Sequence, residues 1–298
     1  MPTEASFRMS IRFDHPVKVW VLQLGGWLPI QFTGVNTMLI DRCVLIATRD
    51  LALNPERSDM QAERWWLQQL DNPRFALNAI LCAAEGWNSS EPTFETFVAE
   101  LADASGTIAK EFPQAAIVRH DPVNFAALYE TVSAARERHL RECAFLSAIA
   151  HLLCNRVAAA RSRKVERQIV DAADANSLAR HSMVVLAALS CLYEPQHGEH
   201  PRIGRGVLKL TPDYTIEQIY NALADIRSLE YLAAASGLPG GSVGFCTRDK
   251  ALAAFWTYLG LNHATWEENS FSATYMPQPQ LFPRLPADEV QNLLTRLR

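Results

Sequence analysis

The sequence predicts an α/β fold: a small, mostly parallel sheet flanked by helices, with a long helical insertion. Short apolar runs at both ends of the predicted core indicate buried strands, and the middle of the chain shows only helical periodicity. With 298 residues, 49% of them apolar and 20% charged, the chain can bury a large core. We expect one domain over residues 1–298, with its core at about 35–105 and 206–262, a helical insertion at about 106–205 and an extended tail at 263–298.

The first half of the core contains the strand that we expect at the centre of the sheet. Residues 38–47 are apolar and β-branched almost throughout, as in a strand buried on both faces. Short extended pieces at 19–22 and 28–32 precede it. Three further helices are expected in this half: one after Ser58 and Asp59, one that carries Glu85, and one starting near 92.

The insertion should consist of helices. Apolar residues recur at helical spacing over about 125–193, with a break near 158–162. The natural interpretation is two long helices, of which the second covers 164–193.

The second half of the core repeats the strand and helix pattern. In chain order we expect a polar loop (195–206), a helix (215–237), a strand (243–246), a helix (249–260), an extended tail with spaced prolines (271–286) and a short closing helix (287–297).

Composition excludes several classes of protein. The net charge of −4 gives no global basic surface, so any nucleic-acid binding must come from a local patch. Six cysteines without a C-x-x-C spacing fit buried thiols in a reducing compartment better than disulfides or zinc. Residues 1–15 lack the apolar segment of a signal peptide, and the longest apolar run, 183–193, is too short to span a bilayer. We therefore expect a soluble, cytoplasmic protein that does not act in a membrane.

Four acidic residues stand in apolar surroundings and are the candidate functional residues. Asp41 lies near the end of the first predicted strand, and Asp249 comes directly after the strand at 243–246. Glu85 ends an apolar stretch, and Asp225 is a single acid inside an apolar helix. Because the carboxyl ends of strands form the ligand crevice of an open α/β sheet, we expect these acids to share one crevice.

The chemistry of such a cluster favours a divalent cation. A carboxylate among apolar neighbours is costly unless a proton, a cation or a hydrogen bond compensates it, and clustered carboxylates repel one another. Mg²⁺ and Mn²⁺ prefer oxygen ligands and keep several waters. Two such ions can activate a water and stabilise the leaving oxygen of a phosphodiester.

The segments around the four acids resemble the PIN-domain nuclease family. Residues 39–46 (LIDRCVLI) look like the opening strand of the family, 83–86 (AAEG) like its glutamate after an apolar helix, and 223–226 (LADI) like its later aspartate. Residues 245–252 (FCTRDKAL) resemble its strand-T-x-D signature, and the order of the acids is preserved. Cys43 departs from the pattern, which usually has Ser or Asn at this position.

The resemblance implies a PIN-like fold and a Mg²⁺- or Mn²⁺-dependent ribonuclease that hydrolyses phosphodiester bonds. Asp41, Asp225 and Asp249 would then be direct metal ligands, and Glu85 would bind the second ion or orient the attacking water. The partner would be a nucleic acid, RNA rather than DNA. The alternative is a PIN-like binding or regulatory module with weak hydrolysis or none, which Cys43 and the large insertion favour.

Basic side chains gather in the predicted insertion. Between residues 136 and 167 there are eight basic and three acidic residues, so this segment is locally positive in an acidic chain. Such a patch would hold phosphates without sequence preference, although a solvated helix face has the same composition. The candidate nucleic-acid contacts are Arg136, Arg138, Arg141, Arg161, Arg163, Lys164 and Arg167, together with Arg248 beside Asp249.

Two competing signals are weaker. Residues 240–244 match the G-x-S-x-G pattern of serine hydrolases around Ser242, and Asp249 and His263 follow in order. However, the predicted strand follows the serine, whereas a nucleophile elbow needs it before. His197 and His200 suggest zinc, but no third ligand has suitable spacing.

Overall fold

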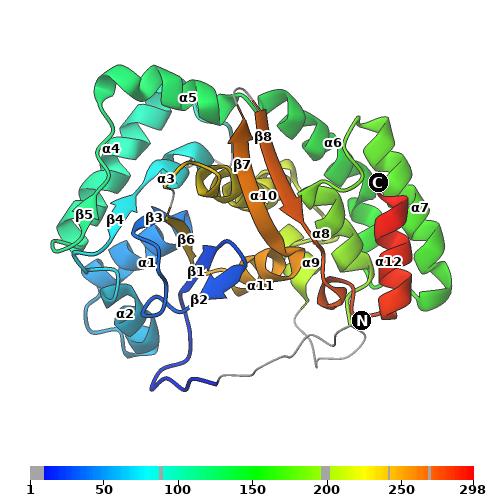
Figure 1. Cartoon of the computed structure of the whole chain (residues 1–298), viewed down its shortest axis with the longest axis horizontal. Coiled ribbons are helices and arrows are strands. Elements are labelled where there is room, and N and C mark those ends of the chain that lie inside the picture. The colour runs from blue at the N-terminus through cyan, green and yellow to red at the C-terminus, as the bar shows by residue number, and fades with distance from the viewer. Residues whose placement is uncertain (1–9, 87–89, 196–201, 241, 268–269) are drawn as a thin grey trace.

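The computed structural model describes residues 10–86, 90–195, 202–240, 242–267 and 270–298. These residues form an α/β fold around a six-stranded sheet that is flanked by helices (Figure 1). In sheet order the strands are β2 (Gly26–Leu28), β1 (Trp20–Gln23), β6 (Val243–Thr247), β3 (Thr37–Ile40), β4 (Ala76–Asn78) and β5 (Ala116–Ile117). Strands β6, β3, β4 and β5 are parallel, and β1 is antiparallel to both of its neighbours. The predicted class, a mostly parallel sheet flanked by helices, is confirmed.

Both faces of the sheet are covered, as expected for parallel strands. Side chains of β3 alternate between two clusters of buried apolar residues: Met38 and Ile40 belong to one, and Leu39 to the other. The first cluster packs under α1 (Arg42–Leu53), α2 (Gln61–Gln68) and α4 (Phe94–Glu111). The second packs under α8 (Met183–Leu192), α9 (Ile203–Leu208), α10 (Ile216–Ser236) and α11 (Lys250–Leu259).

The predicted strand at 38–47 is wrong in its second half. The strand β3 ends at Ile40, and α1 begins at Arg42. The side chain of Asp41 caps this helix by accepting a hydrogen bond from the backbone N–H of Cys43. An apolar run of this length fits a buried strand or a buried helix equally well, and here it is shared between the two.

The predicted helix that carries Glu85 is present as α3 (Ile80–Glu85). The start of the same apolar stretch forms a strand that was not predicted, β4, which pairs with β3 and β5. The helix stops at Gly86, whose φ of +72° lies in the region that favours glycine. A Cβ at this position would meet the carbonyl oxygen of Ser90 at 2.8 Å. Glycine is therefore the residue that fits directly after Glu85.

The range predicted as a purely helical insertion contains one strand of the sheet, since β5 pairs with β4. The helices there are α5 (Phe125–Ser133), α6 (Arg136–Leu153), α7 (Ala159–Ala175) and α8, with the short η2 (Pro122–Asn124). The predicted helix at 164–193 is two helices, because Ser177 has a φ of +53° that a right-handed helix cannot continue.

The C-terminal elements follow the prediction except in the tail and in the predicted loop at 195–206, where residues 203–206 belong to α9. Thr215 and Gln218 form a capping box at the start of α10, and Asp249 caps α11. The tail, however, is an antiparallel hairpin of β7 (Leu261–Glu267) and β8 (Ser270–Tyr275), seen in orange at the centre of Figure 1, followed by η3 (Pro279–Leu281) and α12 (Ala287–Arg296). Among the described residues no helix combines the length and the apolar character that crossing a membrane requires. The remaining short element is η1 (Ser58–Met60).

Candidate functional site

The four predicted acids meet at one cavity, although they come from four separate elements. Asp41 and Asp249 cap α1 and α11, Glu85 ends α3, and Asp225 lies in α10. The cavity has a volume of about 340 Å³ and is also lined by Arg42, Cys43, Ile46, Gly86, Lys209 and Asn221. It contains acidic, basic and amide groups together.

The parallel pairing of β3 and β6 brings Asp41 and Asp249 together. The backbone N–H of Asp41 donates to the carbonyl of Cys246 at 3.0 Å, so both strands end at the same edge of the sheet. Each strand is followed by an aspartate that caps the next helix. This arrangement is the carboxyl-end crevice of an open α/β sheet.

Asp41 is held by two side chains. The hydroxyl of Thr247 donates to its Oδ2, and the thiol of Cys43 donates to the same oxygen at 2.9 Å. Cys43 thus occupies a position where a hydrogen-bond donor is needed and supplies its thiol. Asp41 is only 7% exposed, and burial raises its pKa despite these hydrogen bonds.

Glu85 is fixed by α3 and by two neighbours. The guanidinium Nε of Arg42 lies 3.5 Å from Glu85 Oε2, and the hydroxyl of Tyr220 donates to the Glu85 backbone carbonyl at 2.8 Å. Burial, and after it the negative charge of Asp41, raise the pKa of Glu85 to about 8. Burial and the neighbouring carboxylates therefore outweigh the attraction of Arg42 and Lys209 for the charged form of Glu85.

Lys209 is a site residue that the sequence analysis missed. It follows α9 in a left-handed conformation, with a φ of +51°, and its Nζ lies 2.6 Å from Asp225 Oδ2 and 3.6 Å from Asp249 Oδ2. Burial lowers the pKa of Lys209, but the neighbouring carboxylates outweigh this and the net shift is upward. For Asp225, burial outweighs the attraction of Lys209 and raises its pKa to about 7. The sequence does contain a signal for Lys209. Like the four acids, it is a single charged residue between apolar neighbours, here Leu208 and Leu210.

Asp249 has two separate functions in the structure. Its Oδ1 accepts hydrogen bonds from the backbone N–H groups of Ala251 at 2.8 Å and Leu252 at 2.9 Å, which caps α11. Its Oδ2 faces Lys209. The capping role does not exclude a ligand role, because the two oxygens are engaged differently.

The arrangement of donors around the cavity is not that of a closed metal site. Among the described residues no three His, Cys, Asp or Glu side chains are placed so as to hold a metal ion. In this conformation the ammonium group of Lys209 is the cation that faces Asp225 and Asp249. The donor chemistry nevertheless fits Mg²⁺ or Mn²⁺, because four carboxylates supply the hard oxygen ligands that these ions prefer.

The predicted basic residues lie mostly away from the acids. Arg138 and Arg163 are engaged in ion pairs, with Glu230 and with Glu166 and Glu289. Arg248 lies beside Asp249, and its Nη2 is 3.5 Å from Glu63 Oε1. Exposed side chains remain at Arg136, Arg141, Arg161, Lys164 and Arg167. They belong to α6 and α7, and Figure 1 shows α7 at the edge of the molecule far from β3 and β6.

The competing sites are not assembled in the described part of the chain. The hydroxyl of Ser242 donates to the carbonyl of Gly34 at 3.1 Å, and His263 lies exposed in β7. Asp249 is occupied with α11 and Lys209, so no described hydrogen bonds connect a Ser242, Asp249 and His263 triad. His197 and His200, considered for zinc, lie outside the described residues, as do residues 1–9 of the N-terminal segment.

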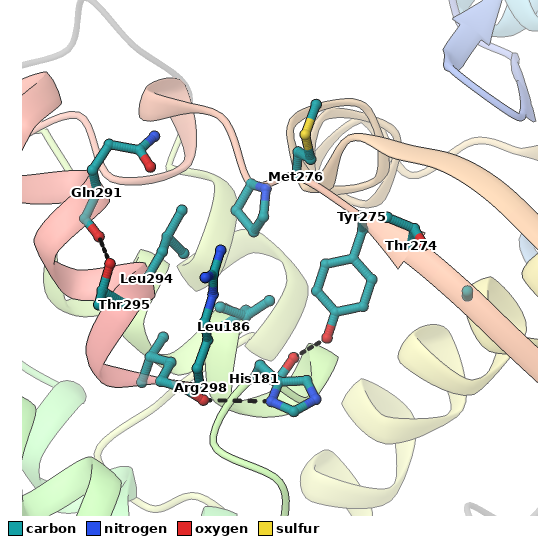
Figure 2. Close-up of a pocket in the computed structure, with 12 residues that line it drawn as sticks. His181, Leu186, Thr274, Tyr275, Met276, Gln291, Leu294, Thr295 and Arg298 are labelled. Atoms are coloured by element: carbon teal, nitrogen blue, oxygen red, sulfur yellow. Dashed lines mark hydrogen bonds between the residues drawn. The ribbon is translucent and has the colours of Figure 1, made fainter.

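A larger cavity, of about 590 Å³, lies between the end of β8, the start of α8 and α12 (Figure 2). Its lining includes His181, Tyr275 and Arg298, and no aspartate or glutamate of the described residues. It therefore lacks the carboxylates of the predicted site.

No family model, curated protein or solved structure matches this chain.

Proposed function

We propose that this chain is a divalent-metal-dependent phosphodiesterase that cleaves RNA, with a PIN-like catalytic site. The observation that carries the proposal is the convergence of Asp41, Glu85, Asp225 and Asp249 on one cavity at the carboxyl ends of β3 and β6. The acids are far apart in the sequence, and a purely structural use of each would not require them to meet. Their order along the chain is also the one that the PIN-domain resemblance implies.

The proposed roles follow from the position of each carboxylate. Asp41, Asp225 and Asp249 would hold Mg²⁺ or Mn²⁺, which when bound lowers the pKa of a coordinated water and neutralises charge on a phosphate. Glu85, which Arg42 and Tyr220 hold in place, would bind a second ion or orient the attacking water. The hydroxyl of Thr247 and the thiol of Cys43 keep one oxygen of Asp41 in a fixed direction.

Lys209 must change its contacts for a cation to bind at Asp225 and Asp249. Its side chain is 48% exposed and can move into solvent. After that movement its ammonium group would be available to a phosphate oxygen at the mouth of the cavity. Together with Arg248 it would supply positive charge on the side of the substrate.

The second candidate is a PIN-like binding or regulatory module without efficient hydrolysis. The observation that favours it is the ion pair of Lys209 with Asp225 at 2.6 Å, which neutralises part of the acidic cluster without a metal. In that case RNA would bind the exposed basic residues of α6 and α7, and the cavity would remain closed to divalent ions.

Cleavage of a single-stranded and of a structured RNA during a Mn²⁺ titration separates the two candidates. We expect cleavage by the parent protein, none in EDTA, and loss of cleavage in Asp41→Asn. The matched control is Asp171→Asn, because Asp171 is an exposed aspartate on α7 that does not line the cavity. RNA binding without cleavage at any Mn²⁺ concentration would favour the binding module. Equal cleavage by Asp41→Asn and the parent would contradict the proposed site.

A further inference from the structure

A second cavity, separate from the acidic one, lies beyond the carboxyl ends of β3 and β4. It has a volume of about 310 Å³, and we call it the α3–α5–α10 cavity after the helices that form most of its wall. In Figure 1 α5 lies at the top of the view, above α3 and α10. The lining residues are Leu39, Asn78, Ile80, Leu81, Ala84, His120, Leu128, Thr131, Val132, Tyr231, Ala234, Ala235, Leu238 and Trp266.

The wall of this cavity is apolar and carries no charged side chain among the described residues. Its aromatic and hydroxyl groups turn their polar atoms to the backbone. The hydroxyl of Tyr231 donates to the carbonyl of Val132 at 3.0 Å, and the indole N–H of Trp266 to that of Ala234 at 2.8 Å. The Thr131 hydroxyl likewise donates to Ala127 at 2.8 Å. These groups therefore offer mainly carbon surface to a ligand.

One polar pair stands in this apolar wall. Asn78 Oδ1 accepts a hydrogen bond from the backbone N–H of Ile80 at 3.0 Å, and this fixes which end of the amide is the oxygen. His120 Nε2 lies 3.1 Å from the same oxygen. Because an amide oxygen only accepts hydrogen bonds, Nε2 is the ring nitrogen that carries the proton. Partial burial lowers the pKa of His120, which favours the neutral ring. In the neutral ring Nδ1 is then an acceptor, and the Asn78 amide nitrogen is a donor.

We propose that the α3–α5–α10 cavity binds a small uncharged molecule with an apolar body and one hydroxyl group. A hydroxyl can donate its proton to His120 Nδ1, the ring nitrogen that does not bond to Asn78. The apolar wall fits the body of such a ligand, and a volume above 300 Å³ lies in the range of small-molecule sites. A charged ligand is disfavoured, because no described lining residue would compensate its charge.

The entrance of the cavity also favours a ligand of this kind. Leu238 and Trp266 are 52% and 43% exposed, so apolar surface faces solvent at the rim. Water gains little in an apolar space of this kind, because it finds few polar partners there. The inference rests only on these residues and is independent of any role of the acidic cavity.

Calorimetric titration of the full chain with 4-ethylphenol tests the proposal, with ethylbenzene and 4-ethylbenzoate as comparison probes. We expect 4-ethylphenol to bind roughly tenfold more tightly than ethylbenzene, because ethylbenzene leaves His120 Nδ1 without a ligand partner. The anionic 4-ethylbenzoate should bind more weakly than either. Equal affinity for 4-ethylphenol and ethylbenzene, or no binding of 4-ethylphenol, would overturn the proposal.

Two variants locate the binding site. Ala235→Phe places a ring in the cavity and should abolish 4-ethylphenol binding, whereas Ala148→Phe, at an exposed alanine of α6, should leave it unchanged. His120→Phe keeps an apolar ring and removes the acceptor, so 4-ethylphenol should bind it no better than ethylbenzene does. Circular dichroism melts establish that each variant is folded. Undiminished 4-ethylphenol binding by folded Ala235→Phe would place the ligand elsewhere and refute the inference.

Discussion

Replacing Asp249 separates its helix-capping role from its proposed ligand role. In Asp249→Asn, the side-chain oxygen that accepts from Ala251 and Leu252 is retained, so the cap of α11 is kept. Asn and Asp are nearly equivalent as N-caps, and the lost attraction to Lys209 acts over 3.6 Å at a half-exposed ammonium group. The relief of repulsion from Asp41 acts in the opposite direction. We therefore expect the stability of the metal-free protein to change by no more than about 0.5 kcal/mol.

Asp249→Ala removes the cap as well. Loss of both hydrogen bonds should destabilise the protein by about 1 kcal/mol, and by as much as about 2 kcal/mol. With an unfolding entropy of about 2.1 cal/mol/K per residue, 1 kcal/mol corresponds to a melting temperature lower by about 2 °C for a chain of 298 residues. The measurement is thermal unfolding in EDTA for the parent and both variants.

Cleavage of RNA in Mn²⁺ is then measured on the same three proteins. If Asp249 is a ligand, both variants lose cleavage, although only Asp249→Ala loses stability. If Asp249→Asn cleaves RNA like the parent, and Asp249→Ala fails only in proportion to its lower stability, then Asp249 is a helix cap and not a ligand. That result would refute the reasoning for this residue.

Three other predictions concern Lys209, Glu142 and Tyr220. Lys209→Gln removes the cation that competes for Asp225, so calorimetry should show Mn²⁺ binding roughly tenfold more tightly than in the parent, about 1.4 kcal/mol. Unchanged affinity would show that Lys209 does not compete. Burial, followed by the charge of Glu230, raises the pKa of Glu142 from 4.5 to about 7. Between these two pH values Glu142 keeps its proton in the folded protein and loses it in the unfolded chain. The free energy of unfolding therefore falls as pH rises from 4.5 to 7. Glu142→Gln should therefore be more stable than the parent above pH 7, by up to roughly 3 kcal/mol, with the difference disappearing near pH 4 in urea unfolding curves; a difference that does not depend on pH would contradict the shift. Tyr220→Phe should cost about 1 kcal/mol in the same assay, because the Glu85 carbonyl loses its donor; no loss of stability would mean that water replaces the hydroxyl.

The elements that the sequence predicted best are those with strong local signals. The predicted helix after Thr215 is confirmed as α10, and a capping box of Thr215 and Gln218 marks its start. The strand before Asp249 and the helix after it were also predicted, because apolar residues and the capping residue lie side by side. For the same reason two acids could be assigned to one edge of the sheet.

The errors arose where an apolar run fits two structures. Residues 38–47 and 76–85 each contain the end of a strand and the start of a helix, and burial on all sides removes the periodicity that would distinguish them. The strand β5 has two residues and depends on its pairing with β4. Such a strand has no local signature.

Lys209 could not be placed from the sequence because its position depends on tertiary structure. The left-handed backbone after α9 directs this lysine to a carboxylate on α10, and nothing in the neighbouring residues indicates that conformation. Two of the acids, Asp41 and Asp249, were easier to find, since they follow strands whose ends meet at one edge of the sheet.

Helix α3 is a common wall of two cavities. Ile80, Leu81 and Ala84 line the α3–α5–α10 cavity, and Glu85, one residue further, lines the acidic cavity. Ala84 and Glu85 are adjacent in this six-residue helix, so a ligand that displaced its apolar side would also displace the carboxylate at its end. Thermodynamic linkage then makes the effect mutual: if the ligand changes the affinity for a cation by some factor, the cation changes the affinity for the ligand by the same factor. Such a protein would report the concentration of one small molecule through the occupancy of a site for another.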